Sequence, residues 1–220
     1  MLIEGFAAPE GSTAGADPPA SNLAGSAPQV LAGIRQPGTS IAIWNRRLPG
    51  SLTCDLAALA ARAPFTATVE DVPEEAVGRM AECLPMPAPI DLLLDVLHLA
   101  RIFTHLVQAD RLRLRLEALD GPGCHRWHAD AVGLRLLCTY RGPGTEWLAL
   151  PGGARVARML RDGAAPPANR LTTGEVALLK GEGFPGHAGQ GCIHRSPPRS
   201  PGAPPRLLLC LDEAGRIPLE

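Results

Sequence analysis

The 220-residue sequence has few aromatic residues, almost no lysine and no long hydrophobic run. Aromatic side chains make up 4% of the chain, with Tyr140 the only tyrosine, and Lys180 is the only lysine among 21 basic residues. No apolar run reaches the roughly 18 residues that span a bilayer, and Glu4 and Glu10 stand where a secretory signal carries positive charge. A net charge of −1 is too weak a signal to suggest nucleic-acid binding. These absences predict a cytoplasmic protein without membrane or nucleic-acid partners, and leave its substrate and oligomeric state open.

Internal repeats and a Gly-rich phosphate loop are also missing, whereas glycine and proline are abundant. The chain has 24 Gly and 23 Pro, well above the average usage of roughly 7% and 5%. A hydrophobic content of 45% argues against disorder throughout. Most of the excess follows residue 120, where short apolar segments alternate with Gly- and Pro-containing turns. The composition therefore favours a fold with many turns over a helical bundle.

The first half of the chain is predicted to be mainly helical after a flexible leader. Residues 1–28 are rich in Ala, Gly, Pro and Ser without apolar periodicity, which is typical of a flexible segment. Residues 29–220 are expected to form a single domain, in which residues 29–109 provide mainly helical support. Helices are predicted over 52–62, 73–83 and 89–108, and the last of these has apolar residues at helical spacing.

From residue 110 the pattern changes to short strands. The segment RLRLRLEAL alternates charged residues with leucines at a period of two, as expected for a half-buried strand. Further short apolar runs follow, separated by Gly/Pro turns, up to RLLLCLD near the C-terminus. Many short strands after a helical region predict an α+β protein in which residues 110–214 form an antiparallel barrel or sandwich.

The clearest chemical motif is the pair His128 and Asp130, which directly precedes a predicted strand. In an extended chain, residues two apart project to the same face, so an imidazole and a carboxylate at this spacing can bind one metal ion together. His194, in the predicted strand CIHRS, is the natural third ligand. Two histidines and one carboxylate on one side of an iron leave positions for other ligands. The alternative is a turn in which Asp130 accepts backbone hydrogen bonds and His128 is exposed.

Six cysteines suggest a competing metal site. In a cytoplasmic protein they are expected to be thiols or ligands and not disulfides. Cys124 precedes the His-x-Asp motif and Cys192 precedes His194 by two residues, so these thiols with His128 and His194 could form a Cys2His2 zinc site. The tight Cys-x-x-Cys pair that makes such a site specific is missing from the sequence.

The order of these segments resembles the double-stranded β-helix of iron(II)/2-oxoglutarate-dependent dioxygenases. After His-Ala-Asp come GLRLLCTY, GPGTEWL, GEVALLKG and His194, and Arg206 follows twelve residues later. The resemblance implies a jelly-roll (cupin-like) barrel braced by the N-terminal helices. It also implies that His128, Asp130 and His194 bind Fe(II), while Arg206 holds the distal carboxylate of 2-oxoglutarate, a role suited to a planar two-pronged donor.

This resemblance is incomplete at the residues that are expected to bind 2-oxoglutarate. Many of those enzymes have Ser or Thr two residues after the arginine, where this chain has Leu208. Arg199 and Arg135 are therefore alternative anion binders. The hydroxyl of Tyr140 is a candidate catalytic group that could donate a hydrogen bond to a bound carboxylate.

The chain also resembles a bacterial family known as domain of unknown function 1826. The segments CHRWHAD, LRLLCTYRGPGTEWL, ALLKG, HRSPP and RLLLCLDE carry this likeness, which extends over nearly everything after the leader. The family resemblance implies an association with genes of zinc homeostasis. The alternative to an oxygenase is therefore a non-catalytic protein that binds zinc or another metal.

Overall fold

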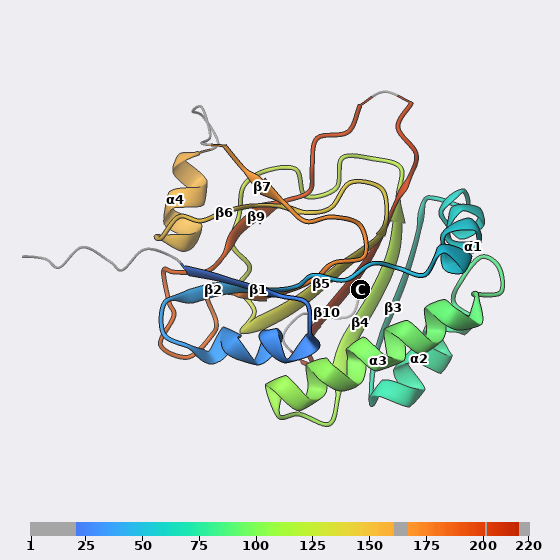
Figure 1. Cartoon of the computed structure of the whole chain (residues 1–220), viewed down its shortest axis with the longest axis horizontal. Coiled ribbons are helices and arrows are strands. Elements are labelled where there is room, and N and C mark those ends of the chain that lie inside the picture. Colours follow the sequence, from blue (N-terminus) through green and yellow to red (C-terminus); the bar gives the residue numbers. More distant parts are fainter. Residues whose placement is uncertain (1–20, 161–166, 201, 216–220) are drawn as a thin grey trace, which may run out of the picture.

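Two β-sheets facing each other form the centre of the molecule (Figure 1). The computed structural model describes residues 21–160, 167–200 and 202–215. Helices cover the outer face of the larger sheet, and the smaller sheet faces its inner side. Within the described ranges, no helix has the length and hydropathy needed to cross a membrane.

The larger sheet has seven strands in the order β1-β2-β8-β5-β10-β4-β3. All neighbours pair antiparallel except β1 and β2, which are parallel. The strands are β1 (Ser21–Gly25), β2 (Thr39–Trp44), β3 (Phe65–Asp71), β4 (Leu112–Leu119), β5 (Leu134–Arg141), β8 (Val176–Lys180) and β10 (Arg206–Glu213). The C-terminal strand β10 therefore lies between β5 and β4 in the middle of the sheet.

The smaller sheet has three short strands in the order β7-β6-β9. They are β6 (Glu146–Leu148), β7 (Asn169–Arg170) and β9 (Ile193–Arg195). His128 adds a single antiparallel bridge to His194 at the edge of β9. Through this bridge the segment that follows β4 is joined to the smaller sheet.

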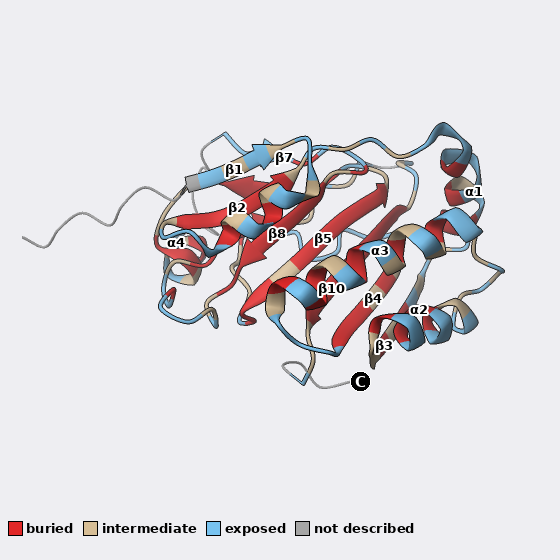
Figure 2. Ribbon diagram, turned by 60° about the horizontal axis from the view of Figure 1, so that its bottom comes forward, coloured by how far each residue is buried: buried red, intermediate tan, exposed pale blue. Residues whose placement is uncertain are grey.

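Four α-helices and one 3-10 helix complete the described fold. They are η1 (Pro28–Arg35), α1 (Gly50–Ala60), α2 (Pro73–Glu82), α3 (Ile90–Val107) and α4 (Gly153–Met159). Helix α2 begins with a proline and two acidic residues in its first turn, which suits the positive end of a helix. Helices α1, α2 and α3 pack on the outer face of the larger sheet, whose strands they bury (Figure 2).

Alternation along the strands of the larger sheet separates two environments. On β10, Leu207, Leu209 and Leu211 belong to the main hydrophobic core beneath the helices. Leu208 and Cys210, between them, join a second apolar cluster that includes residues of the smaller sheet. Successive side chains of a strand point to opposite faces, so each central strand serves the core with one half of its residues and the inter-sheet space with the other half.

The observed architecture confirms the α+β jelly-roll prediction, with the sheets open and not closed into a barrel. The predicted helices appear as α1, α2 and α3. Strand β1 lies inside the predicted leader, whose residues 1–20 fall outside the described ranges. The region 29–109, predicted to be mainly helical, also contributes strands β2 and β3 to the larger sheet.

Candidate metal centre

His128 and His194 lie side by side because their backbones pair. The His128 amide donates to the His194 carbonyl at 3.0 Å, and the His194 amide donates to the His128 carbonyl at 2.9 Å. Their ring centroids are 4.4 Å apart. One antiparallel bridge thus brings together two imidazoles that are 66 positions apart in the chain.

Asp130 completes a cluster of possible ligands. One ligand atom from each of His128, Asp130 and His194 lies within 4.8 Å of the other two. The Nε2 atom of His194 is 3.3 Å from Asp130 Oδ2, and that of His128 is 3.8 Å from Asp130 Oδ1. The backbone at Asp130 is fixed by the loop after β8, since Glu182 donates its amide to the Asp130 carbonyl at 2.7 Å.

Both rings are oriented by backbone carbonyls. The Nδ1 atom of His128 is 2.8 Å from the Arg126 carbonyl oxygen, and that of His194 is 3.1 Å from the Cys192 carbonyl oxygen. A carbonyl oxygen only accepts, so each Nδ1 carries the proton and each Nε2 presents a lone pair. Such hydrogen bonds are the usual way in which a protein fixes the tautomer of a metal-binding histidine.

Arg135 braces the carboxylate of Asp130. Its Nη1 donates to Asp130 Oδ1 at 2.6 Å, while its Nε and Nη2 donate to the two oxygens of Asp212 at 2.6 and 2.9 Å. Burial by itself raises the pKa of Asp130, but the charges of His194, Arg135 and His128 lower it overall. At neutral pH Arg135 is the permanent charge among these, because burial lowers the pKa of His194 to about 4.

This arrangement fits a bound metal ion. Asp130 Oδ2 is buried and has no hydrogen-bond partner among the described residues, although it points toward His194. A buried carboxylate oxygen without a partner is costly, and a cation between it and the two Nε2 atoms would satisfy it. Two imidazole nitrogens and one carboxylate oxygen are ligands that suit Fe(II).

The two histidines line a cavity of about 160 Å³ between the sheets. Arg206, at the start of β10, lies in the same cavity and is 7% exposed. Its Nη1 donates to Ser196 Oγ at 3.0 Å, and its Nη2 donates to Thr145 and Thr139 hydroxyls at 2.8 and 3.2 Å.

Among the described residues no carboxylate forms an ion pair with Arg206, and its Nε lacks a partner. Burial lowers the pKa of Arg206 to about 10, with Glu117 acting in the opposite direction. A buried guanidinium held only by hydroxyls is a prepared anion site.

The hydroxyl missing at Leu208 is supplied by other strands. Leu208 joins the apolar inter-sheet cluster, whereas Thr139 on β5, Thr145 before β6 and Ser196 after β9 surround the Arg206 guanidinium. These hydroxyls come from segments far apart in the chain, so no local motif around Arg206 could reveal them.

Two predicted site residues have other roles. The side chain of Tyr140 points to the helix-covered face of β5, where its hydroxyl donates to Asp95 Oδ2 on α3 at 2.6 Å. Its proposed catalytic role is therefore wrong, because Tyr140 faces away from Arg135 and the metal-site cavity. Arg135 itself is occupied by Asp130 and Asp212, so it positions a ligand and is not free to bind 2-oxoglutarate.

The remaining candidates lie outside the ligand cluster. Arg199 is absent from the lining of the metal-site cavity and lies in an adjoining hollow. Cys124 is exposed at the cavity wall, and Cys192 is buried in the apolar inter-sheet cluster. Burial raises the pKa of the Cys192 thiol. The described ligand cluster includes neither thiol, so the structure gives no support to the Cys2His2 zinc site.

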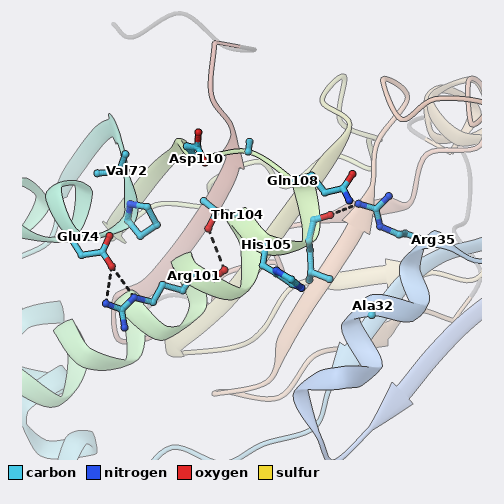
Figure 3. Close-up of a pocket in the computed structure, with 12 residues that line it drawn as sticks. Ala32, Arg35, Val72, Glu74, Arg101, Thr104, His105, Gln108 and Asp110 are labelled. Atoms are coloured by element: carbon cyan, nitrogen blue, oxygen red, sulfur yellow. Dashed lines mark hydrogen bonds and ion pairs between the residues drawn. The ribbon is translucent and has the colours of Figure 1, made fainter.

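A wider hollow, of about 1000 Å³, lies on the helix side of the molecule near α2, α3 and η1 (Figure 3). Three of its charged groups already have partners. Arg101 pairs with Glu74, and Arg35 donates to the Leu106 carbonyl oxygen. This hollow contains none of the clustered metal ligands, so size alone does not mark the reactive site.

The fold and this cluster define a jelly-roll protein with a candidate His-Asp-His metal centre. The chain belongs to the family described as protein of unknown function DUF1826, whose model matches residues 25–212. No curated protein sequence is similar enough to this chain to count as a match.

Solved structures with a similar fold include proteins named as dioxygenases and hydroxylases. Dioxygenase for auxin oxidation 1 from Arabidopsis thaliana, solved with 2-oxoglutarate, has 11% identity and a TM-score of 0.50, covering 89% of this chain and 92% of its own. A prolyl-4-hydroxylase from Pseudomonas putida has 13% identity and a TM-score of 0.43, covering 84% and 96%. At 11% identity the likeness to the auxin dioxygenase establishes the fold alone.

Proposed function

We propose that this protein is an iron(II)- and 2-oxoglutarate-dependent oxygenase. The observation that carries the proposal is that His128 and His194, which cluster with Asp130, line the same cavity as Arg206, a buried guanidinium without a carboxylate partner among the described residues. A protein that binds a metal without catalysing a reaction has no need of such a guanidinium beside the metal ligands.

His128, Asp130 and His194 would hold Fe(II) from one side and leave the other side to the ligands that react. Bound iron supplies oxygen activation, in a reaction that converts 2-oxoglutarate, O₂ and a substrate C–H into succinate, CO₂ and a C–OH. Arg135 keeps Asp130 ionised and fixes one carboxylate oxygen, so that Oδ2 faces His194. Preorganised ligands of this kind raise metal affinity.

Arg206 would bind the distal carboxylate of 2-oxoglutarate. The three hydroxyls of Thr139, Thr145 and Ser196 fix the guanidinium plane before the ligand arrives. Nonpolar walls at Leu137 and Leu208 limit water around the ion pair. Low local polarity strengthens the attraction between the two charges.

Turnover tests this proposal directly. The purified chain with Fe(II), ascorbate and 2-oxoglutarate is expected to form succinate in an oxygen-dependent manner, even slowly without its substrate. Arg206→Gln should weaken 2-oxoglutarate binding about 10- to 100-fold, the usual range for a hydrogen-bonded charge. Arg158→Gln, at an exposed position on α4, is the matched control and should change nothing. Iron-loaded protein that forms no succinate would refute the oxygenase proposal.

A further inference from the structure

A second hollow adjoins the metal-site cavity at Arg206. It has a volume of about 440 Å³ and lies between the loops that follow β4, β5 and β9. Leu119, Ser196 and Arg206 line both spaces. The hollow is within the size range of small-molecule sites, and its contents would lie next to the metal-site cavity.

Most of its wall is apolar and stiff. Five prolines line it together with Leu119 and Ala203; they are Pro122, Pro143, Pro197, Pro198 and Pro204. Proline rings have a fixed φ and no backbone N–H donor, so this wall offers nonpolar contact with few hydrogen bonds. It suits the hydrocarbon or aromatic part of a small molecule.

Two arginines that line this hollow, Arg170 and Arg199, differ in whether their positive charge is paired with a carboxylate. Arg170 at its edge is already paired with Glu146. Arg199 donates from Nη2 to the Ala203 carbonyl oxygen at 2.5 Å, which leaves its positive charge uncompensated. Its Nη1 is buried, and it has neither a hydrogen-bond partner nor an ion pair among the described residues. Arg199 thus brings a guanidinium that is unpaired within the described ranges to a hollow lined by five prolines.

We infer that this hollow binds the substrate, and that the substrate is a small acid with an apolar body. The inference rests on the proposed function, because 2-oxoglutarate would occupy the 160 Å³ cavity and the substrate needs separate space beside it. The Arg199 guanidinium would bind the substrate carboxylate, and the proline wall would contact its body.

Binding of model acids tests the inference without requiring turnover. The probes are 3-phenylpropanoate and hexanoate, with their neutral amides, titrated calorimetrically into the full chain with and without saturating Co(II) and 2-oxoglutarate. At least one acid should bind about tenfold more tightly than its amide, in line with the strength of a charge-assisted hydrogen bond. Arg199→Gln should remove that preference, Arg199→Lys should restore part of it, and Arg158→Gln should leave it unchanged.

Three results would overturn the inference. One is equal binding, or no binding, of acids and amides. Another is an unchanged preference in an Arg199→Gln protein that melts like the wild type. The third is displacement of the acid by 2-oxoglutarate, which would assign Arg199 to the cosubstrate. Arg199-dependent acid binding in a protein that forms no succinate would instead refute the oxygenase proposal and leave the acid site in place.

Discussion

The two faces of the larger sheet use alternate residues of the same strands for different purposes. On the helix-covered face, Leu207, Leu209 and Leu211 are completely buried in the main core. On the other face of β10, Arg206 and Asp212 are also buried, but they contact hydroxyls and a guanidinium. One face stabilises the fold, whereas the other places buried charges where a metal and an anion can use them.

Burial therefore affects the free energy in opposite directions on the two faces. Burying a leucine is favourable, whereas burying a charge without a full set of partners costs free energy that a ligand can recover. Substitutions of core leucines on the helix-covered face should therefore reduce stability, and substitutions of the buried charged residues on the inter-sheet face should reduce ligand binding.

The largest effect is expected on the helix-covered face. Leu209→Ala should reduce the free energy of unfolding by about 2–5 kcal/mol, because it leaves a cavity in a packed core. Leu94→Ala, at a position on α3 that is 58% exposed, should stay within about 0.5 kcal/mol of the wild type. Urea denaturation measures both. A loss equal to that of Leu94→Ala would show that the two faces do not differ in the way described.

Arg135→Lys should affect metal binding more than stability. Lysine keeps the positive charge but cannot donate to Asp130 and Asp212 in the geometry of the guanidinium. The affinity for Co(II), followed by its visible spectrum, should fall about 10- to 100-fold, as is usual when the support of a ligand is lost. Unchanged affinity with an unchanged spectrum would exclude a positioning role. Arg158→Lys on α4 is the control.

The metal-free protein should lose stability in mild acid because of His194. Burial lowers the pKa of His194 to about 4, whereas an unfolded histidine titrates near 6.5. Between these pH values the unfolded chain binds more protons, so stability falls as the pH falls, with a limiting slope of about 1.4 kcal/mol per pH unit.

Urea denaturation at pH 7, 6 and 5 measures this slope. His194→Gln should flatten it, while His125→Gln, at an exposed position, should preserve it. A slope that is the same in the wild type and in His194→Gln would show that His194 is not buried as a neutral ring.

The smallest effect is expected from a single hydroxyl around Arg206. Thr145→Val removes the acceptor 2.8 Å from Nη2, but Thr139 still accepts from the same nitrogen. The 2-oxoglutarate concentration for half-maximal succinate formation should rise about threefold to tenfold, in proportion to one hydrogen bond. Thr173→Val, whose hydroxyl bonds to the Gly142 carbonyl outside the cavity, should leave it unchanged.

The candidate metal ligands could be predicted because part of the cluster is a short motif in the sequence. His128 and Asp130 are two residues apart, and the order of the following strands pointed to His194. Arg206 could be named only through the resemblance to iron(II)/2-oxoglutarate-dependent dioxygenases. The structure brings the first three together, and Arg206 lines the same cavity as the two histidines. A single β-bridge between His128 and His194 holds these two residues side by side, and no pattern in the sequence predicts that bridge.

The role of Arg135 could not be predicted, because it depends on the order of the strands in the sheet, which the sequence does not show. Arg135 was expected to bind an anion, but the pairing of β5 with β10 places Asp212 opposite it. Tyr140 and Arg135 are an odd number of residues apart on one strand, so the alternation of a strand predicts that their side chains point to opposite faces. Strand β3 was missed although Phe65, Ala67 and Val69 alternate along it. Strand β1 has a composition too rich in small residues to stand out.

The most direct test of the central claim is anaerobic addition of Fe(II) and 2-oxoglutarate to the purified chain. If His128, Asp130 and His194 hold iron in the cavity that contains Arg206, a weak visible charge-transfer band should appear only when both are present. The band should be absent in His194→Ala and should require about 10- to 100-fold more 2-oxoglutarate in Arg206→Gln. A wild-type protein that binds one iron per chain and forms no such band would contradict the account.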